Sequence, residues 1–244
     1  MIEIIEEVHR SGARLDATLA ALTDPEVCAP SALAGWNRGD VVTHLARSVD
    51  AYLWLLAVAR TGAEPGPRPG TERPAAAVAT ELATALATAL ATALAADLRT
   101  RLARLAEAAA SMPAERWDTL VTALAGWRHP AWYTLHRCWR ELETHHVDLN
   151  VGYRPADWPP AYVTWALDDT LGALAARDFP VARVEAVDLG RTWTVSPTGP
   201  DVVGPGHAVL GWLSGRTADA PPTSGGHSLP DPPNWPLPPA PGWS

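Results

Sequence analysis

A glutamate and a histidine four residues apart most constrain how this chain can fold. Glu141 and His145 lie in a segment with helical spacing of apolar residues, so their side chains leave the same face of a helix, one turn apart. A carboxylate and an imidazole arranged in this way can take two corners of a tetrahedral metal site. His44, in a different predicted helix, can supply a third ligand if the two helices pack side by side. Three protein ligands with the fourth position open are typical of a catalytic zinc ion.

Each of these residues also has an ordinary structural interpretation. Glu141 and His145 could form an exposed pair on a helix surface, and His44 could be a surface or core histidine. Spacing alone also allows His146 to replace His145 as a ligand. Otherwise Glu143 and His146 face away from the pair, either as solvated groups or as groups that support the ligands.

Cys138 raises a separate question about the number of ligands. It lies three residues before Glu141 and seven before His145, so it shares their helix face. As a fourth ligand it would close the site and make it structural. A buried cysteine in a helix is more often a small hydrophobic residue, and we favour that interpretation.

The first 150 residues carry helical signals throughout. Ala83 to Leu94 repeat the tetrapeptide Ala-Thr-Ala-Leu. This repeat is too rich in alanine and threonine for a membrane span and favours a helix. Asp40, or Asn37 just before it, can cap one helix, and Pro130 can open another. We predict helices at about residues 5–22, 40–60, 75–111 and 130–149. Their connections favour a four-helix bundle over residues 1–154, in which inward-facing side chains can build a metal site.

Residues 155–244 have a different pattern and predict a small α+β domain. A helix is expected at residues 162–177, and residues 181–188 and 192–195 alternate with the period of strands. Gly190 and Arg191 between the two strands mark a hairpin. Val202 and Val203 can form a short third strand before a helix at residues 207–214, and a proline-rich tail begins near Pro221.

The composition narrows the possible partners. The chain has 19 Lys and Arg against 27 Asp and Glu, a net charge of −8, which disfavours nucleic acid and anionic membranes. Two cysteines are too few for a disulfide framework, and the acidic N-terminus does not resemble a signal peptide. We therefore expect a cytoplasmic protein, and a monomer.

Several short motifs occur together along nearly the whole chain. They are Gly35-Trp36-Asn37-Arg38 leading to His44-Leu45, then Arg140-Glu141-x-x-x-His145-x-Val147-Asp148-Leu149, then Ser214-Gly215-Arg216, and finally Pro232-Pro233-Asn234-Trp235. In combination they resemble the mycothiol-dependent maleylpyruvate isomerase family, a branch of the DinB-like metal-binding four-helix bundles. The histidine and Glu-x-x-x-His signals are shared by the whole superfamily, whereas the C-terminal motifs are narrower and favour the isomerase branch.

The resemblance implies a zinc ion held by His44, Glu141 and His145, with mycothiol as a low-molecular-weight thiol cofactor bound through its sulfur. It implies a cis–trans isomerase of aromatic degradation, in the gentisate pathway, that converts the dicarboxylate maleylpyruvate to fumarylpyruvate. Arg216 matches an arginine that the family uses near its site, and Arg73 in the loop after the second helix is a second candidate. No residues that bind the thiol itself can be named.

Two other functions remain open at this point. Related proteins include thiol S-transferases, which use the same metal and thiol on other electrophiles in detoxification or natural-product biosynthesis. A non-catalytic bundle, stabilised by a metal and binding a small ligand or a partner, is the third interpretation. The sequence does not separate isomerisation from transfer, because they differ in whether the thiol is released again.

Overall fold

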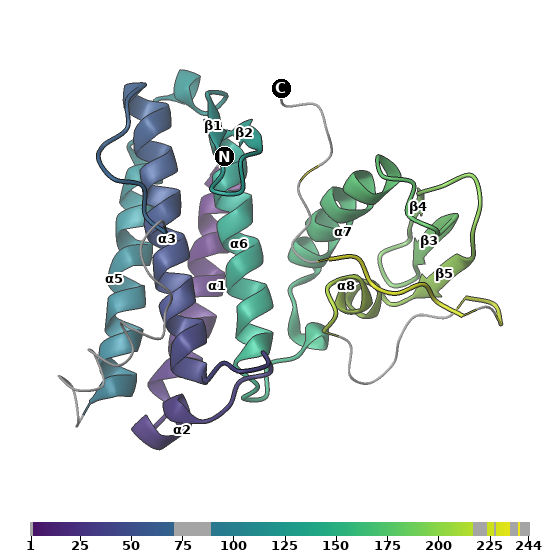
Figure 1. Cartoon of the computed structure of the whole chain (residues 1–244), viewed down its shortest axis with the longest axis horizontal. Coiled ribbons are helices and arrows are strands. Elements are labelled where there is room, and N and C mark those ends of the chain that lie inside the picture. Colours follow the sequence, from purple (N-terminus) through teal and green to yellow (C-terminus); the bar gives the residue numbers. More distant parts are fainter. Residues whose placement is uncertain (1, 71–88, 217–223, 227, 235–238, 240–244) are drawn as a thin grey trace. The chain divides into compact units, whose positions relative to one another are not determined.

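Four long helices form the described core of the first of two structural units (Figure 1). The computed structural model describes residues 2–70, 89–216, 224–226, 228–234 and 239. The first unit spans Met1–Gly152 and the second begins at Tyr153. The long helices of the first unit are α1 (Ile2–Ala20), α3 (Arg38–Thr61), α5 (Leu90–Ala110) and α6 (Ala131–Asp148).

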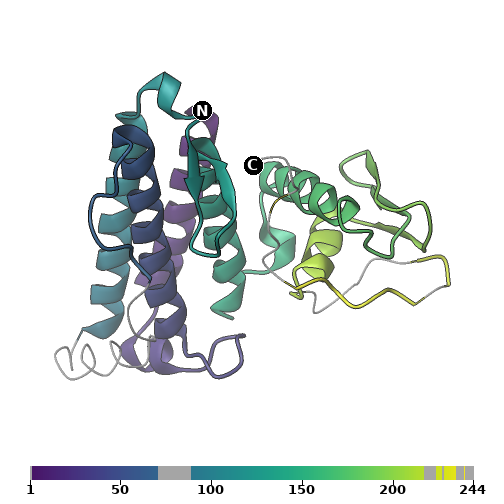
Figure 2. The ribbon, with the colours of Figure 1, turned by 45° about the horizontal axis from the view of Figure 1, so that its top comes forward.

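The four helices pack as a bundle with a shared apolar interior. Both α1 and α3 contact α5 and α6, and the turned view of Figure 2 shows the helices running alongside one another. Each helix contributes leucines that are almost completely buried, namely Leu15, Leu45, Leu105 and Leu142. Burying one such side chain stabilises the fold by about 1.5–3 kcal/mol. The predicted four-helix bundle is confirmed.

The helix boundaries agree with the prediction where the chain is described. Of the helix predicted at residues 75–111, α5 covers Leu90–Ala110; residues 71–88, with half of the tetrapeptide repeat, lie outside the described residues. The start of α3 settles which residue caps it. The Asn37 side chain accepts a hydrogen bond from the Asp40 backbone N–H, and the Asp40 carboxylate accepts one from the Asn37 N–H. This reciprocal capping box fixes the first turn of the helix that carries His44.

Several short elements of the described chain were not predicted. Helix α2 (Asp24–Cys28) lies where a loop was expected, and strands β1 (Leu120–Thr122) and β2 (Arg128–Pro130) form an antiparallel hairpin before α6. A helix of five residues has little more than one turn, and a strand of three residues is too short to establish an alternating pattern.

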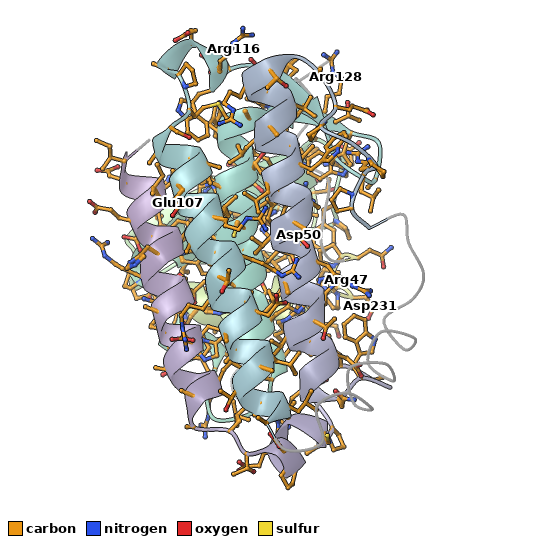
Figure 3. All side chains as sticks on the ribbon, turned by 90° about the vertical axis from the view of Figure 1, so that its left-hand side faces the viewer. Arg47, Asp50, Glu107, Arg116, Arg128 and Asp231 are labelled. Carbon is orange, nitrogen blue, oxygen red and sulfur yellow. The ribbon has the colours of Figure 1, made fainter. Side chains whose placement is uncertain are left out.

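Helix α3 is, among the described helices, the one long and apolar enough to span a membrane by length and composition. Half of its most apolar 18-residue window is buried, and the helix packs against α5 and α6 as a core helix does. Its outer face carries charged groups, and Arg47 and Asp50 are visible there in Figure 3. The carboxylate of Asp50 pairs with Arg101 of α5.

Arg38 ties the start of α3 to the end of α6, and its removal should destabilise the protein. Its guanidinium donates to the backbone carbonyls of Leu149, Asn150 and Glu26 at 2.8–3.2 Å. Hydrogen bonds from a charged donor contribute about 1.5–3 kcal/mol each, less where solvent reaches them. We expect Arg38→Ala to lower the free energy of unfolding in urea by about 2 kcal/mol. Lysine should restore little of it, because it lacks the planar fork; full stability in Arg38→Lys would contradict this role.

The second unit combines two helices with a small sheet. Helix α7 (Pro160–Ala175) packs against α8 (Gly206–Leu213), which contacts the sheet. In the sheet, β3 (Arg183–Ala186) lies between the antiparallel β4 (Arg191–Thr194) and the parallel β5 (Asp201–Gly204). The predicted α+β character is confirmed, including the hairpin and the short third strand. The described parts of the proline-rich tail form neither helix nor strand.

Candidate metal centre

The bundle brings together the three predicted ligands from two facing helices. His44 projects from α3, and Glu141 and His145 project from α6. The Nε2 atoms of both histidines lie 3.2 Å from the same carboxylate oxygen, Oε2 of Glu141. One ligand atom from each residue can be chosen so that all three lie within 4.8 Å of one another. His146 is not part of this group.

Two neighbours orient the histidines. His145 Nδ1 lies 2.8 Å from the carboxylate of Asp148, so Nε2 is the nitrogen that faces Glu141. The ring of His44 lies edge-on to the ring of Trp36, with 5.6 Å between centroids, and to that of His145 at 4.8 Å. The side chain of His44 is 37% exposed, against 18% for Glu141 and 15% for His145. Solvent therefore reaches the group from the side of His44.

Glu141 and His145 stabilise each other in their charged forms. Burial disfavours the ionised form of Glu141, but the hydrogen bonds and charges of His145 and His44 outweigh it and hold the pKa of the carboxyl well below its usual range. Burial likewise lowers the pKa of His145, yet Asp148 and Glu141 together raise it to about 9. Such an arrangement holds one negative carboxylate between two imidazole nitrogens, where a cation can replace the protons.

The donor set fits zinc. Two nitrogens and a carboxylate oxygen are common zinc ligands. Ligand atoms about 2.0–2.1 Å from a tetrahedral zinc ion would be roughly 3.3 Å apart, close to the 3.2 Å that separates each imidazole nitrogen from Glu141. The contact of His145 with a buried carboxylate is also typical of zinc-bound histidines.

Near Glu141, Cys138 and Tyr52 are buried weak acids. Cys138 is completely buried; burial, and then the charge of Glu141, raise the pKa of its thiol. The pKa of Tyr52 is raised by the same two causes. Cys138 does not belong to the group of possible ligand atoms formed by the described residues, which agrees with its interpretation as a small hydrophobic residue.

The role of Cys138 can be tested by metal content. We expect Cys138→Ala to bind zinc with the same stoichiometry as the wild-type chain, because the thiol is buried and protonated. His44→Ala should lose zinc under the same conditions. Metal analysis after gel filtration compares the two, and loss of zinc from Cys138→Ala as well as from His44→Ala would make the site a closed structural one.

Glu143 and His146 are not solvated, which corrects one of the sequence-based interpretations. Both are almost fully buried, because α1 covers this face of α6. The Glu143 carboxylate accepts hydrogen bonds from Ser11 and Arg14, and His146 Nε2 lies 2.8 Å from the Thr18 hydroxyl. They join α6 to α1 and do not join the ligand group.

The structure describes one of the two predicted arginines and not the other. Arg216 lies directly after α8 in the second unit, where Nη1 donates to the carbonyl of Ser214 at 2.7 Å. Its predicted role near the metal ligands stays a prediction. Arg73 lies outside the described residues.

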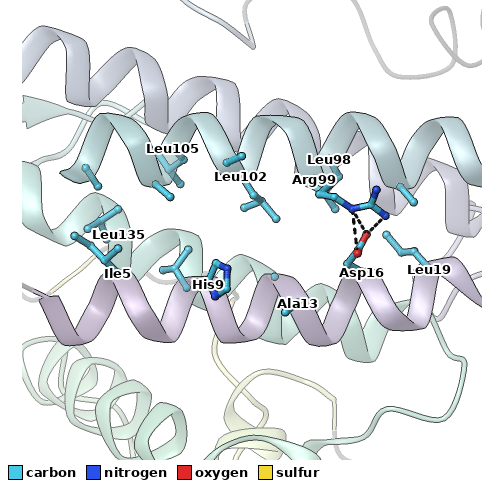
Figure 4. Close-up of a pocket in the computed structure, with 16 residues that line it drawn as sticks. Ile5, His9, Ala13, Asp16, Leu19, Leu98, Arg99, Leu102, Leu105 and Leu135 are labelled. Atoms are coloured by element: carbon cyan, nitrogen blue, oxygen red, sulfur yellow. Dashed lines mark hydrogen bonds and ion pairs between the residues drawn. The ribbon is translucent and has the colours of Figure 1, made fainter. Parts of the chain in front are cut away.

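An apolar cavity of about 260 Å³ lies elsewhere in the bundle, between α1 and α5 (Figure 4). Leucine, alanine and valine side chains make up most of its lining, and the Asp16–Arg99 ion pair at 2.7 Å borders it. None of the three predicted ligands lines it. The apolar lining of this cavity alone would therefore point away from the residues that can do chemistry.

Fold and site together define a helical-bundle protein with a candidate metal centre between facing helices. The chain belongs to the family whose model is described as the mycothiol maleylpyruvate isomerase N-terminal domain, which matches residues 8–150. This confirms the resemblance found in the sequence motifs.

Two solved structures share the fold. The crystal structure of a mycothiol-dependent maleylpyruvate isomerase is 23% identical in sequence, with a TM-score of 0.77 and 96% of each chain covered. A histidine-to-alanine mutant described under the same name is 21% identical, with the same TM-score and coverage. The comparison with curated proteins gave no match.

Proposed function

We propose that this protein is a zinc- and mycothiol-dependent cis–trans isomerase that converts maleylpyruvate to fumarylpyruvate. The observation that carries the proposal is the meeting of His44, Glu141 and His145 on α3 and α6 within a domain of the isomerase family. Three protein ligands would leave one position on a zinc ion open for an exogenous sulfur.

Some residues of the chain would hold the zinc ion, and the exposed side of the group would admit the thiol and the substrate. A zinc ion held by the three ligands would supply a position at which a thiol is deprotonated at neutral pH. Glu141 contributes the one negative charge among the ligands, and Asp148 keeps the His145 nitrogen aimed at the site. His44, the most exposed of the three, lies where the thiol and the substrate can enter.

When bound, the thiol would supply a sulfur nucleophile that adds reversibly to the cis double bond of the substrate and leaves again after the central bond has rotated, so that it would be regenerated unchanged and no redox partner would be needed.

A dicarboxylate with enolate character requires cationic partners. We propose Arg216 for this role, with Arg73 as the second candidate. The support for Arg216 is its match to the family motif Ser214-Gly215-Arg216.

The test is the loss of maleylpyruvate absorbance with purified, zinc-loaded protein, with and without mycothiol. We expect conversion to fumarylpyruvate that requires the thiol and is abolished in Glu141→Gln. Glu143→Gln is a control, since it changes another carboxylate on the same helix, one that is buried against α1 and lies outside the ligand group.

The outcomes separate the candidate functions. A zinc-binding protein that forms a stable adduct of mycothiol with an electrophile but does not isomerise maleylpyruvate would be an S-transferase. A protein that holds zinc and accepts no thiol at all would be a non-catalytic bundle, and either result would overturn the isomerase proposal.

A further inference from the structure

Asp148 connects the candidate metal centre to the end of α6. It is the last residue of that helix and is 2% exposed. Its carboxylate lies 2.8 Å from His145 Nδ1, on the side of the ring opposite the nitrogen that faces Glu141. A buried carboxylate so placed accepts the Nδ1 proton and leaves the Nε2 lone pair for a cation.

The backbone of the same residue holds the loop that reaches the other histidine. The Asp148 carbonyl accepts a hydrogen bond from the Ala32 N–H at 2.8 Å. Within that loop, the N–H and the hydroxyl of Ser31 both donate to the carbonyl of Trp36 at 2.9 Å. The Trp36 ring in turn lies against His44. Asp148 is therefore linked to both imidazoles, directly to one and through the loop to the other.

We propose that Asp148 is the positioning residue of the metal centre, whose carboxylate fixes the tautomer and the orientation of His145. This inference rests on the proposed zinc site and assigns the residue no contact with the metal or the substrate. An imidazole with a carboxylate partner is also a stronger ligand.

A purely structural role for Asp148 makes a different prediction. Any buried carboxylate on α6 stabilises the helix through its hydrogen bonds, and Glu143 does so with Ser11 and Arg14. Glu143 is 1% exposed and on the same helix, but it is not one of the residues of the ligand group. Glu143 is therefore the matched control, which shows how far the loss of any buried carboxylate on α6 changes zinc binding.

The experiment measures the zinc dissociation constant of the full-length metal-free proteins by competition with a chromophoric chelator. We expect Asp148→Asn to weaken zinc binding by about 10–100-fold, and Glu143→Gln to change it by less than about threefold. Urea unfolding of the same metal-free samples reports the stability of each variant. Asp148→Ser gives the same test if the asparagine variant does not fold.

The possible results distinguish failure of the positioning role, of the metal site and of the proposed function. Wild-type zinc affinity in a folded Asp148 variant would overturn the positioning role and leave the proposed function standing. Equal weakening in Glu143→Gln would show a general effect of stability and overturn it as well. Wild-type protein that binds no zinc would overturn the metal site and this inference together, whereas bound zinc without isomerase activity would overturn only the proposed function.

Discussion

Glu141→Gln should weaken zinc binding by more than about 100-fold, beyond the 10–100-fold that loss of an outer hydrogen-bond partner costs. Oε2 of Glu141 is the atom that both histidine nitrogens approach at 3.2 Å, so it lies at the centre of the ligand group. A glutamine of the same size keeps the packing but offers a neutral oxygen, which removes the only negative charge among the three ligands. Zinc content after gel filtration and the dissociation constant by chelator competition measure the effect.

The controls for this prediction lie on the same two helices. His44→Ala should also lose tight zinc binding, because it removes the ligand supplied by α3. Glu143→Gln should retain one zinc per chain, since its carboxylate faces α1. If Glu141→Gln still bound one zinc ion tightly, the metal would lie elsewhere in the protein. The contacts of the Glu141 carboxylate with the two imidazoles would then be a hydrogen-bonded cluster without a metal.

The ligand group could be predicted from the sequence because its geometry is mostly local. Glu141 and His145 are one helical turn apart, and any helix places them on the same face. His44 lies in another predicted helix, and spacing left open whether it is a ligand; the resemblance of the motifs to a known family assigned it to the site. The same reasoning could have identified Asp148, because it lies three residues after His145 on the same face of the helix.

Other features depend on contacts that spacing does not encode. Glu143 and His146 are polar and could face water on an isolated helix, but α1 covers them and supplies Ser11, Arg14 and Thr18 as partners. Which helix covers which face is decided by the whole bundle. The β1–β2 hairpin likewise gains its stability from its neighbours, since two strands of three residues are unstable alone.

The stability of the metal-free protein should fall as the pH rises from about 6.5 to about 9. His145 has a pKa of about 9 in the folded protein and about 6.5 when unfolded. Because the folded pKa is raised, the protonated imidazole contributes stability that is fully present below pH 6.5 and lost by about pH 9. The difference of the two pKa values corresponds to about 3 kcal/mol. Urea unfolding at pH 6 and pH 9.5, in the presence of a chelator, measures it.

Zinc affinity should change in the opposite direction over the same range. Binding requires a neutral His145, so a proton must leave the ring, and the affinity should rise by about tenfold per pH unit up to about pH 9. Glu141 remains ionised throughout, because its pKa is held low, and so adds no slope. In His145→Gln the free energy of unfolding should depend less on pH than in the wild-type protein. The dependence that remains comes from titratable groups that both proteins share. A wild-type protein whose stability did not fall between pH 6 and pH 9.5 relative to this variant would show that the histidine is not held as an imidazolium between Asp148 and Glu141.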